Sequence, residues 1–180
     1  KGELAGLKWS DVDFEKLTIN INKQRNYVTG YGVLESPPKT DAGIRTVTIS
    51  QTVLNLLKSY KKEQLQNRLK FGNAWKNEPY VFLHEDGSAI YPNRPYMWFT
   101  NFLKRHNLPK ITFHQLRHSN ASLLISSGED VVTVSGRLGH SDKSITLNTY
   151  SHIIKSKEAQ VANKMDKFYS SLSSIHINAG

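Results

Sequence analysis

Two histidines and an arginine lie close together in the segment TFHQLRHS, as His114, Arg117 and His118. Their i, i+3 and i+4 spacing places them on one side of a helix, because a helical turn has 3.6 residues. An arginine offers a planar, permanently charged fork that suits a phosphate, and a histidine can donate a hydrogen bond or exchange a proton. The segment predicts a phosphate-binding helix face, although a His-x-x-Arg pair that stands alone is more often an ordinary polar helix face.

A tyrosine that could act as a nucleophile follows further along the chain. Tyr150 stands in the segment YSH, and His140 precedes it in the segment LGHS. The pKa of a free tyrosine is about 10, so a nucleophilic tyrosine needs cationic neighbours or a base that favours the phenolate. Together with Lys39, Arg117 and the histidines would supply that bias and would stabilise a pentavalent phosphate. The alternative is a core ring whose hydroxyl is satisfied by a hydrogen bond.

Composition favours a polyanionic partner. The chain has 24 Lys and Arg against 15 Asp and Glu, a formal net charge of +9 with His neutral. Nucleic acid is the leading partner class, because each phosphate neutralised releases condensed counterions. The sequence has no cysteine, which excludes a disulfide scaffold and a cysteine metal site. It shows no apolar run of about 18 residues and no signal peptide at its first residues, so we expect a cytoplasmic protein without membrane contact.

The periodicity of apolar residues predicts a mixed α+β domain, mainly helical, with a small antiparallel three-stranded sheet near the N-terminus. A helix opens the chain, strands follow within 17–22 and 46–50, and residues 23–35 form a further strand. Asp41 to Gly43 should be a turn, so that Lys39 and Arg45 flank a hairpin loop. The predicted helices are 51–69, 95–107, 112–126, 130–138 and 156–169. On the helix from 112, we expect Phe113, Leu116, Leu123 and Leu124 to form the core-facing arc, with the histidines beside it.

Five short segments resemble the tyrosine recombinases, also called phage-type integrases. They occur in the family's order and span nearly the whole chain: GEL at 2–4, PKT at 38–40, HQLRHS at 114–119, LGHS at 138–141 and YSH at 150–152. The resemblance implies the tyrosine recombinase catalytic-domain fold and site-specific DNA recombination or integration, as in mobile elements and phages. It also implies double-stranded DNA and other recombinase protomers as partners, in a tetrameric synapse when the protein is full length.

The resemblance also implies a role for each matching residue. Tyr150 would attack a DNA phosphodiester, which gives a 3′-phosphotyrosine intermediate and a free 5′-hydroxyl. Arg117 and His140 would hold the non-bridging oxygens. His114 would bind phosphate and assist proton transfer, and Lys39 would protonate the departing 5′-oxygen. Because bond energy is retained in the covalent intermediate, neither ATP nor a metal is required.

Four further residues receive supporting roles on the same ground. Glu3 matches the acidic residue of the first segment, which orients a neighbouring catalytic side chain. His118 and His152 also match the family's motifs, and each would either assist the reaction or serve the packing around the site. Arg45 would contact phosphate or serve the structure.

One departure concerns the first segment, which reads Arg-x-Gly-Glu in the family. Lys1 occupies the x position, so the family's arginine would stand one residue before this chain. We therefore expect residues 1–180 to be an N-terminally truncated catalytic domain without the core-binding domain, which binds DNA weakly and recombines poorly. Residues 153–180 form a tail helix, which docks either on a neighbouring protomer or back on its own domain.

Two other functions remain as alternatives. A non-catalytic DNA-binding module would have the same fold and charge. A histidine-metal nuclease is disfavoured, because HQLRH lacks the glutamate of the HExxH zinc motif and Arg117 would lie beside the ion.

Overall fold

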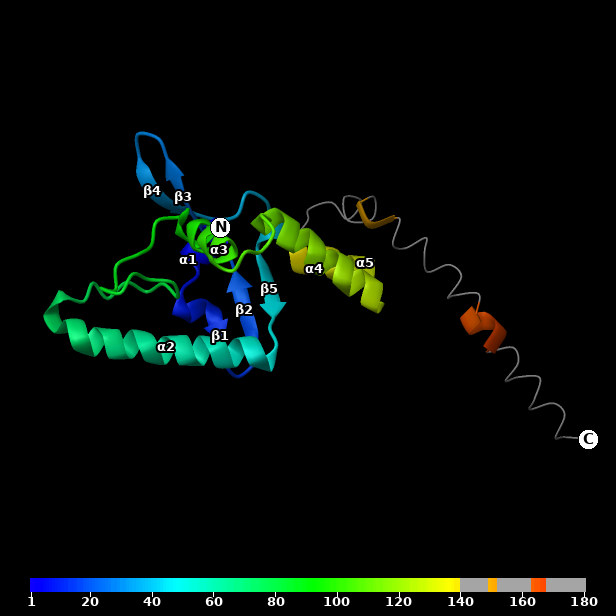
Figure 1. Cartoon of the computed structure of the whole chain (residues 1–180), viewed down its shortest axis with the longest axis horizontal. Helices are drawn as coiled ribbons and strands as arrows, with labels where there is room; N and C mark the ends of the chain where they lie inside the picture. Colours follow the sequence, from blue (N-terminus) through cyan, green and yellow to red (C-terminus); the bar gives the residue numbers. More distant parts are fainter. Residues whose placement is uncertain (140–148, 152–162, 168–180) are drawn as a thin grey trace, which may run out of the picture.

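The computed structural model describes residues 1–139, 149–151 and 163–167, and it has the mixed α+β architecture that the sequence predicts. The elements, in chain order, are α1 (Gly2–Gly6), η1 (Trp9–Asp11), β1 (Val12–Asp13), β2 (Thr18–Ile21), β3 (Gln24–Val28), β4 (Gly32–Ser36), η2 (Asp41–Gly43), β5 (Arg45–Thr48), α2 (Gln51–Phe71), η3 (Gly72–Ala74), α3 (Arg94–Arg105), α4 (Phe113–Ser127) and α5 (Val131–Leu138). Figure 1 shows the long α2 along one side, the β3–β4 hairpin projecting from the body, and α4 beside α5.

The predicted three-stranded antiparallel sheet is present, in the order β1-β2-β5. Apolar residues of its two longer strands face each other, with Ile19 opposite Val47. The prediction of one strand over 23–35 is wrong, because this segment forms a separate hairpin of β3 and β4. The glycines at its turn, Gly30 and Gly32, have φ values of 83° and 80°, which a continuous strand does not allow.

The predicted hairpin around residues 41–43 is also wrong. Lys39 and Arg45 do flank a tight turn, η2, but this turn leads from β4 in one sheet to β5 in the other. The pairing of Ile21 with Arg45 joins β5 to β2, so β4 and β5 are not partners. Arg45 is therefore the first residue of β5, and the pairing of β5 with β2 sets its position.

Capping residues set the boundaries of the helices that follow. The Thr112 hydroxyl accepts from the Gln115 amide and the Gln115 side chain accepts from the Thr112 amide, a capping box that starts α4. Gly128 ends α4 in the left-handed conformation, and the Asp130 carboxylate accepts two amides at the start of α5. These ends confirm the predictions of helices over 112–126 and 130–138.

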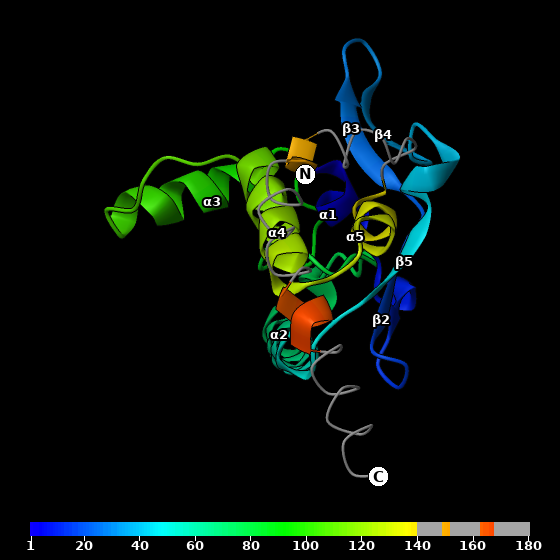
Figure 2. The ribbon, with the colours of Figure 1, turned by 90° about the vertical axis from the view of Figure 1, so that its right-hand side faces the viewer.

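Two apolar clusters form the core. One joins α1, β1, α2 and the chain before α3, through Leu7, Val12, Leu57 and Val81. The other joins α4 to α5 through Ala121, Ile125, Val134 and Leu138, and it includes the ring of Tyr150. Figures 1 and 2 agree that α4 and α5 lie side by side, and Figure 2 shows β5 next to α5. The second cluster therefore brings the tyrosine segment to α4.

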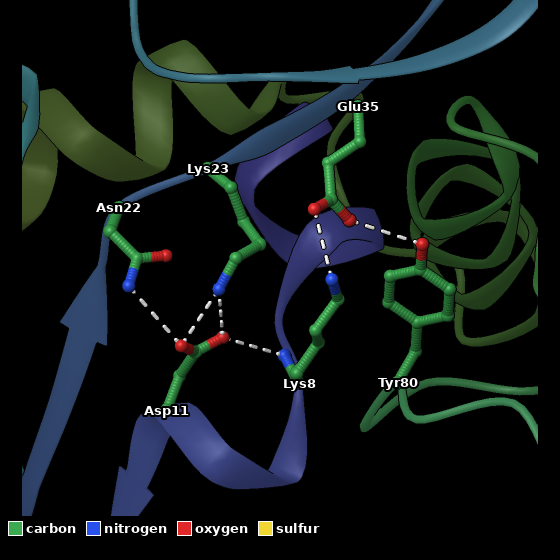
Figure 3. Close-up of polar contacts among 6 residues, drawn as sticks. All are labelled: Lys8, Asp11, Asn22, Lys23, Glu35 and Tyr80. Carbon is green, nitrogen blue, oxygen red and sulfur yellow. Dashed lines mark hydrogen bonds and ion pairs between the residues drawn. The ribbon is translucent and has the colours of Figure 1, made fainter.

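A polar network ties the segment that follows α1 to the β3–β4 hairpin. Figure 3 shows its six side chains: Lys8, Asp11, Asn22, Lys23, Glu35 and Tyr80. Asp11 is buried, and its carboxylate accepts from Lys23 Nζ at 2.8 and 2.9 Å and from the Lys8 amide at 2.9 Å. Glu35 accepts from Lys8 Nζ at 2.9 Å and from the Tyr80 hydroxyl at 3.1 Å. The network thus fixes the segment that follows α1, and with it the position of Glu3.

Candidate active site

The site is built on the inward face of α4. Ala121 and Ile125 are buried, and His114 and His118 lie on the same face, seven residues before each of them. The predicted core-facing arc is wrong in part, because Leu116 is 39% exposed and Leu123 is 67% exposed. The face of α4 that packs against α5 carries Ala121 and Ile125. The half-buried His118 continues this packed face, whereas His114 is exposed.

The hydroxyl of Tyr150 reaches this face directly. It lies 2.7 Å from His118 Nδ1, and His118 Nε2 lies 2.8 Å from His114 Nε2. The Tyr150 ring is only 3% exposed, packed in the α4–α5 cluster, whereas His114 is exposed. The three side chains form one hydrogen-bonded row from the core to the surface.

Burial controls the ionisation of the tyrosine. It raises the pKa of Tyr150 above its ordinary value, and the positive charge of Arg117 opposes this rise without cancelling it. In this arrangement the phenol keeps its proton at neutral pH. A base in contact with the hydroxyl is then needed before the oxygen can attack.

Arg117 points from α4 toward the C-terminal end of α5. Its Nη2 donates to the Leu138 carbonyl, and its Nε is buried without a hydrogen-bond partner among the described residues. Burial and then the positive charge of Arg45 lower the pKa of Arg117, while Glu3 and Tyr150 raise it. An arginine stays protonated through such shifts, so Arg117 is a half-buried cation with one buried N–H unpaired among the described residues.

Arg45 and Glu3 form an ion pair beside Arg117. Arg45 Nη1 and Nη2 donate to the two carboxylate oxygens of Glu3 at 2.9 and 3.0 Å. Arg45 Nε donates to the Arg137 carbonyl at 3.1 Å, and Nη1 also donates to the Gly43 carbonyl at 3.0 Å. Four of the five N–H groups of Arg45 are thus engaged within the protein. Two guanidinium groups, those of Arg45 and Arg117, bind the last carbonyls of α5, where the helix dipole favours positive charge.

Two glycines let these elements come together. A Cβ on Gly2 would lie 2.9 Å from the Asn26 side chain and 3.0 Å from the Arg25 carbonyl, so α1 can rest against β3 only with glycine there. Gly139 ends α5 with φ 71°, and a Cβ there would lie 2.9 Å from the Ala42 carbonyl and 3.0 Å from Arg45 Cδ. The end of α5 at Gly139 therefore packs closely against η2 and Arg45.

The structure places the remaining predicted site residues as follows. Lys39 is exposed, between β4 and η2. His140 and His152 lie outside the described residues, as do most of the tail positions, 153–162 and 168–180. Sequence reasoning missed the C-terminal end of α5 as a centre of the site. The LGHS segment could have indicated this, because its Leu138 supplies the carbonyl that Arg117 binds and its Gly139 ends the helix.

Two absences hold for the described part of the chain. Within residues 1–139, 149–151 and 163–167, no helix is both long and apolar enough to cross a bilayer. Over the same ranges, no three His, Asp or Glu side chains are grouped so that they could hold a metal ion. The facing nitrogens of His114 and His118 bond each other.

Residues 1–157 match the phage integrase family. The chain belongs to this family. The tyrosine recombinase XerC-like protein of Caldanaerobacter subterraneus subsp. tengcongensis is 34% identical over 180 residues, which cover 94% of this chain and 46% of that protein. The ICEBs1 integrase of Bacillus subtilis is 33% identical over 168 residues, covering 92% of this chain and 44% of that protein. This integrase-family chain thus spans about half the length of the curated relatives it matches.

Solved structures of tyrosine recombinases share the fold of this integrase-family chain. The Tn1549 transposon integrase in complex with circular intermediate DNA superposes with a TM-score of 0.71 and 25% identity, covering 93% of this chain and 55% of that chain. The XerA recombinase gives a TM-score of 0.61 at 24% identity, over 88% of this chain and 51% of that chain. The predicted tyrosine recombinase catalytic-domain fold is confirmed.

Proposed function

We propose that this chain carries the catalytic site of a site-specific recombinase, which cleaves and rejoins DNA through a 3′-phosphotyrosine at Tyr150. The observation that carries the proposal is the contact between the Tyr150 hydroxyl and His118, on the helix that also bears Arg117. Residues far apart in sequence meet there, as a nucleophile beside a base and a half-buried cation. Membership of the phage integrase family supports the same reaction.

The roles of the other residues follow from their positions. Arg117 binds a non-bridging phosphate oxygen, for which the planar, permanently charged fork of this half-buried side chain is suited. His114, exposed at the end of the histidine row, binds phosphate and exchanges protons with solvent. Lys39 protonates the leaving 5′-oxygen, and His140 adds a phosphate ligand. His152 supports the nucleophile's segment.

Arg45 serves this site as a structural cation more than as a DNA contact. Its side chain is 14% exposed and most of its donors bind Glu3 and backbone carbonyls. A phosphate would have to displace one of these partners to bind it. Glu3 in turn orients Arg45, which is how the acidic residue of the first segment acts on the catalytic side chains.

The partners of the proposed recombinase are double-stranded DNA and further protomers in a synapse. The formal net charge of +9 supports a DNA partner. Among the similar structures, the Tn1549 transposon integrase is in complex with DNA. We propose the cytoplasm as the compartment in which this protein acts. Because the chain spans about half of its relatives, we propose that it is the catalytic domain of a longer protein. Its tail over 153–180 docks either on a neighbouring protomer or back on its own domain.

The test is the formation of a covalent adduct. The full-length protein is incubated with nicked duplexes made from the DNA that flanks its gene, where the ends of a mobile element would lie. An adduct that resists boiling in detergent and disappears with protease is expected for the wild type. Tyr150→Phe should abolish it, and Tyr60→Phe, a ring in the other cluster, should leave it unchanged.

A non-catalytic DNA-binding module is the second candidate, favoured by the deep burial of Tyr150. It predicts DNA binding by the wild type with no adduct on any duplex. Adduct formation in a chelator would also exclude a histidine-metal nuclease.

A further inference from the structure

The row of Tyr150, His118 and His114 contains a proton acceptor that no family motif assigns to the nucleophile. His118 is the only described titratable side chain within hydrogen-bonding distance of the Tyr150 hydroxyl, at 2.7 Å. A general base must lie within about 2.6–3.2 Å of the oxygen whose proton it takes. His118 Nδ1 meets this condition before any DNA is bound.

The directions of the hydrogen bonds along the row can be worked out from donor counts. If Tyr150 donates to His118 Nδ1, then His118 Nε2 carries a proton and donates to His114 Nε2 at 2.8 Å. In the reverse direction His118 would donate to the phenol oxygen, and the tyrosine proton would be left with the His118 carbonyl at 3.5 Å. That distance is too long for a good hydroxyl hydrogen bond, so the first direction satisfies every donor better.

We propose that His118 accepts the proton of Tyr150 during DNA cleavage and passes a proton from its opposite nitrogen to His114, which releases it to water. This inference rests on the proposed function. The Tyr150 oxygen forms a bond to phosphorus, and the bond from phosphorus to the 5′-oxygen breaks. The tyrosine proton goes to His118 Nδ1, the Nε2 proton moves to His114 Nε2, and His114 releases one proton to water. Lys39, the general acid of the proposed function, gives the 5′-oxygen the proton with which it leaves as a hydroxyl, and Lys39 then takes a proton from water. One proton goes to water and one returns from it, so the step balances.

The surroundings of the row suit this role. Burial holds the pKa of Tyr150 up, so the phenol does not lose its proton unaided. Titratable groups that touch His118 among the described residues are Tyr150 and His114. The charge that acts on Tyr150 is Arg117, and Arg45 and Glu3 in turn act on Arg117. The His114 ring stands at 87° to the His118 ring and is exposed, so a proton that reaches it can enter solvent.

The experiment separates activation of the nucleophile from protonation of the leaving group. The full-length protein cleaves the nicked duplex that gives the adduct, in two forms: one with the ordinary 5′-oxygen and one with sulfur in its place. A sulfur leaving group departs without a proton, so a variant that lacks the general acid recovers on it. A variant that lacks the general base does not.

His118→Asn keeps an acceptor near the Nδ1 position but cannot take a proton. We expect adduct formation to slow by about 10²- to 10⁴-fold on both duplexes, with DNA affinity within about twofold of the wild type. His106→Asn, at an exposed histidine that ends α3, is the matched control and should behave as the wild type.

A rescue guards against a purely structural effect. Difluorotyrosine in place of Tyr150 ionises at lower pH and needs less help from a base, so it should restore most of the rate lost in His118→Asn. A normal rate for His118→Asn, recovery of that variant on the sulfur duplex, or failure of difluorotyrosine to restore its rate would each overturn the inference. If the wild type itself forms no adduct, the proposed function fails first, which is a different result.

Discussion

Replacing Arg45 by lysine should uncouple the first helix from the end of α5. Lysine keeps the charge but has no fork, so it cannot bind both Glu3 oxygens and the Arg137 carbonyl together. Hydrogen bonds to charged groups contribute about 1.5–3 kcal/mol each, but Glu3 is 38% exposed, which weakens its share. We expect the free energy of unfolding to fall by about 2–3 kcal/mol.

The dependence on Glu3 is tested by a double-mutant cycle. Chemical denaturation of the wild type, Arg45→Lys, Glu3→Gln and the double variant should give a coupling energy of about 1–2 kcal/mol, because both single changes remove the same pair. Arg68→Lys, at an exposed arginine of α2, should change stability by less than about 0.5 kcal/mol.

The same variants decide between the two roles of Arg45. A positioning role predicts that Arg45→Lys and Arg45→Ala slow adduct formation by about 10- to 100-fold while DNA affinity and its salt dependence stay unchanged. Additive effects in the cycle would refute the ion pair as a coupling element. A weaker affinity for Arg45→Ala, with a salt slope reduced by about one, would instead identify Arg45 as a phosphate contact.

Three further changes test other parts of the account. In Asp11→Asn, Lys23 loses its buried partner, so the free energy of unfolding should fall by about 3 kcal/mol. Burial opposes the ionisation of Asp11, but hydrogen bonds from Lys23 and the Lys8 amide outweigh burial and lower the pKa of Asp11. The wild type should therefore lose this stabilisation as the pH falls below about 3.9, whereas the Asp11→Asn variant should not show that loss in acid. Gly139→Ala places a Cβ against the Ala42 carbonyl at positive φ and should cost about 1–3 kcal/mol by denaturation, whereas Gly136→Ala, with open space around it, should cost nothing. Lys39→Ala, at an exposed residue, should keep stability within about 0.5 kcal/mol yet slow adduct formation at least about 100-fold on the ordinary duplex and much less on the sulfur duplex.

Helices and the central sheet could be predicted because local signals define them. Thr112 and Gln115 cap α4, and Asp130 caps α5. The alternation of apolar and polar residues around Ile19 and around Val47 marks the two strands β2 and β5. The connection through η2 could not be predicted, because a turn sequence does not say which strands it joins. Only pairing across the sheet places Arg45 next to Ile21.

The site was predictable in its residue types and less so in its contacts. Motif spacing brings His114, Arg117 and His118 together on a helix, and the structure keeps them so. The face of α4 that packs against α5 carries Ala121 and Ile125, and the pattern of leucines along the helix does not reveal this. The row from Tyr150 to His118 joins residues 32 positions apart, so its geometry arises only from packing.

The measurement that tests the central claim most directly is mass spectrometry of the covalent adduct after digestion with trypsin and a nuclease. Cleavage after lysine gives the peptide 144–155, SITLNTYSHIIK, which contains a single tyrosine, Tyr150. We expect this peptide to carry a nucleotide joined through its 3′-phosphate to the Tyr150 oxygen. A phosphate link at another residue, or an unmodified peptide in a protein that has cleaved its DNA, would contradict the account.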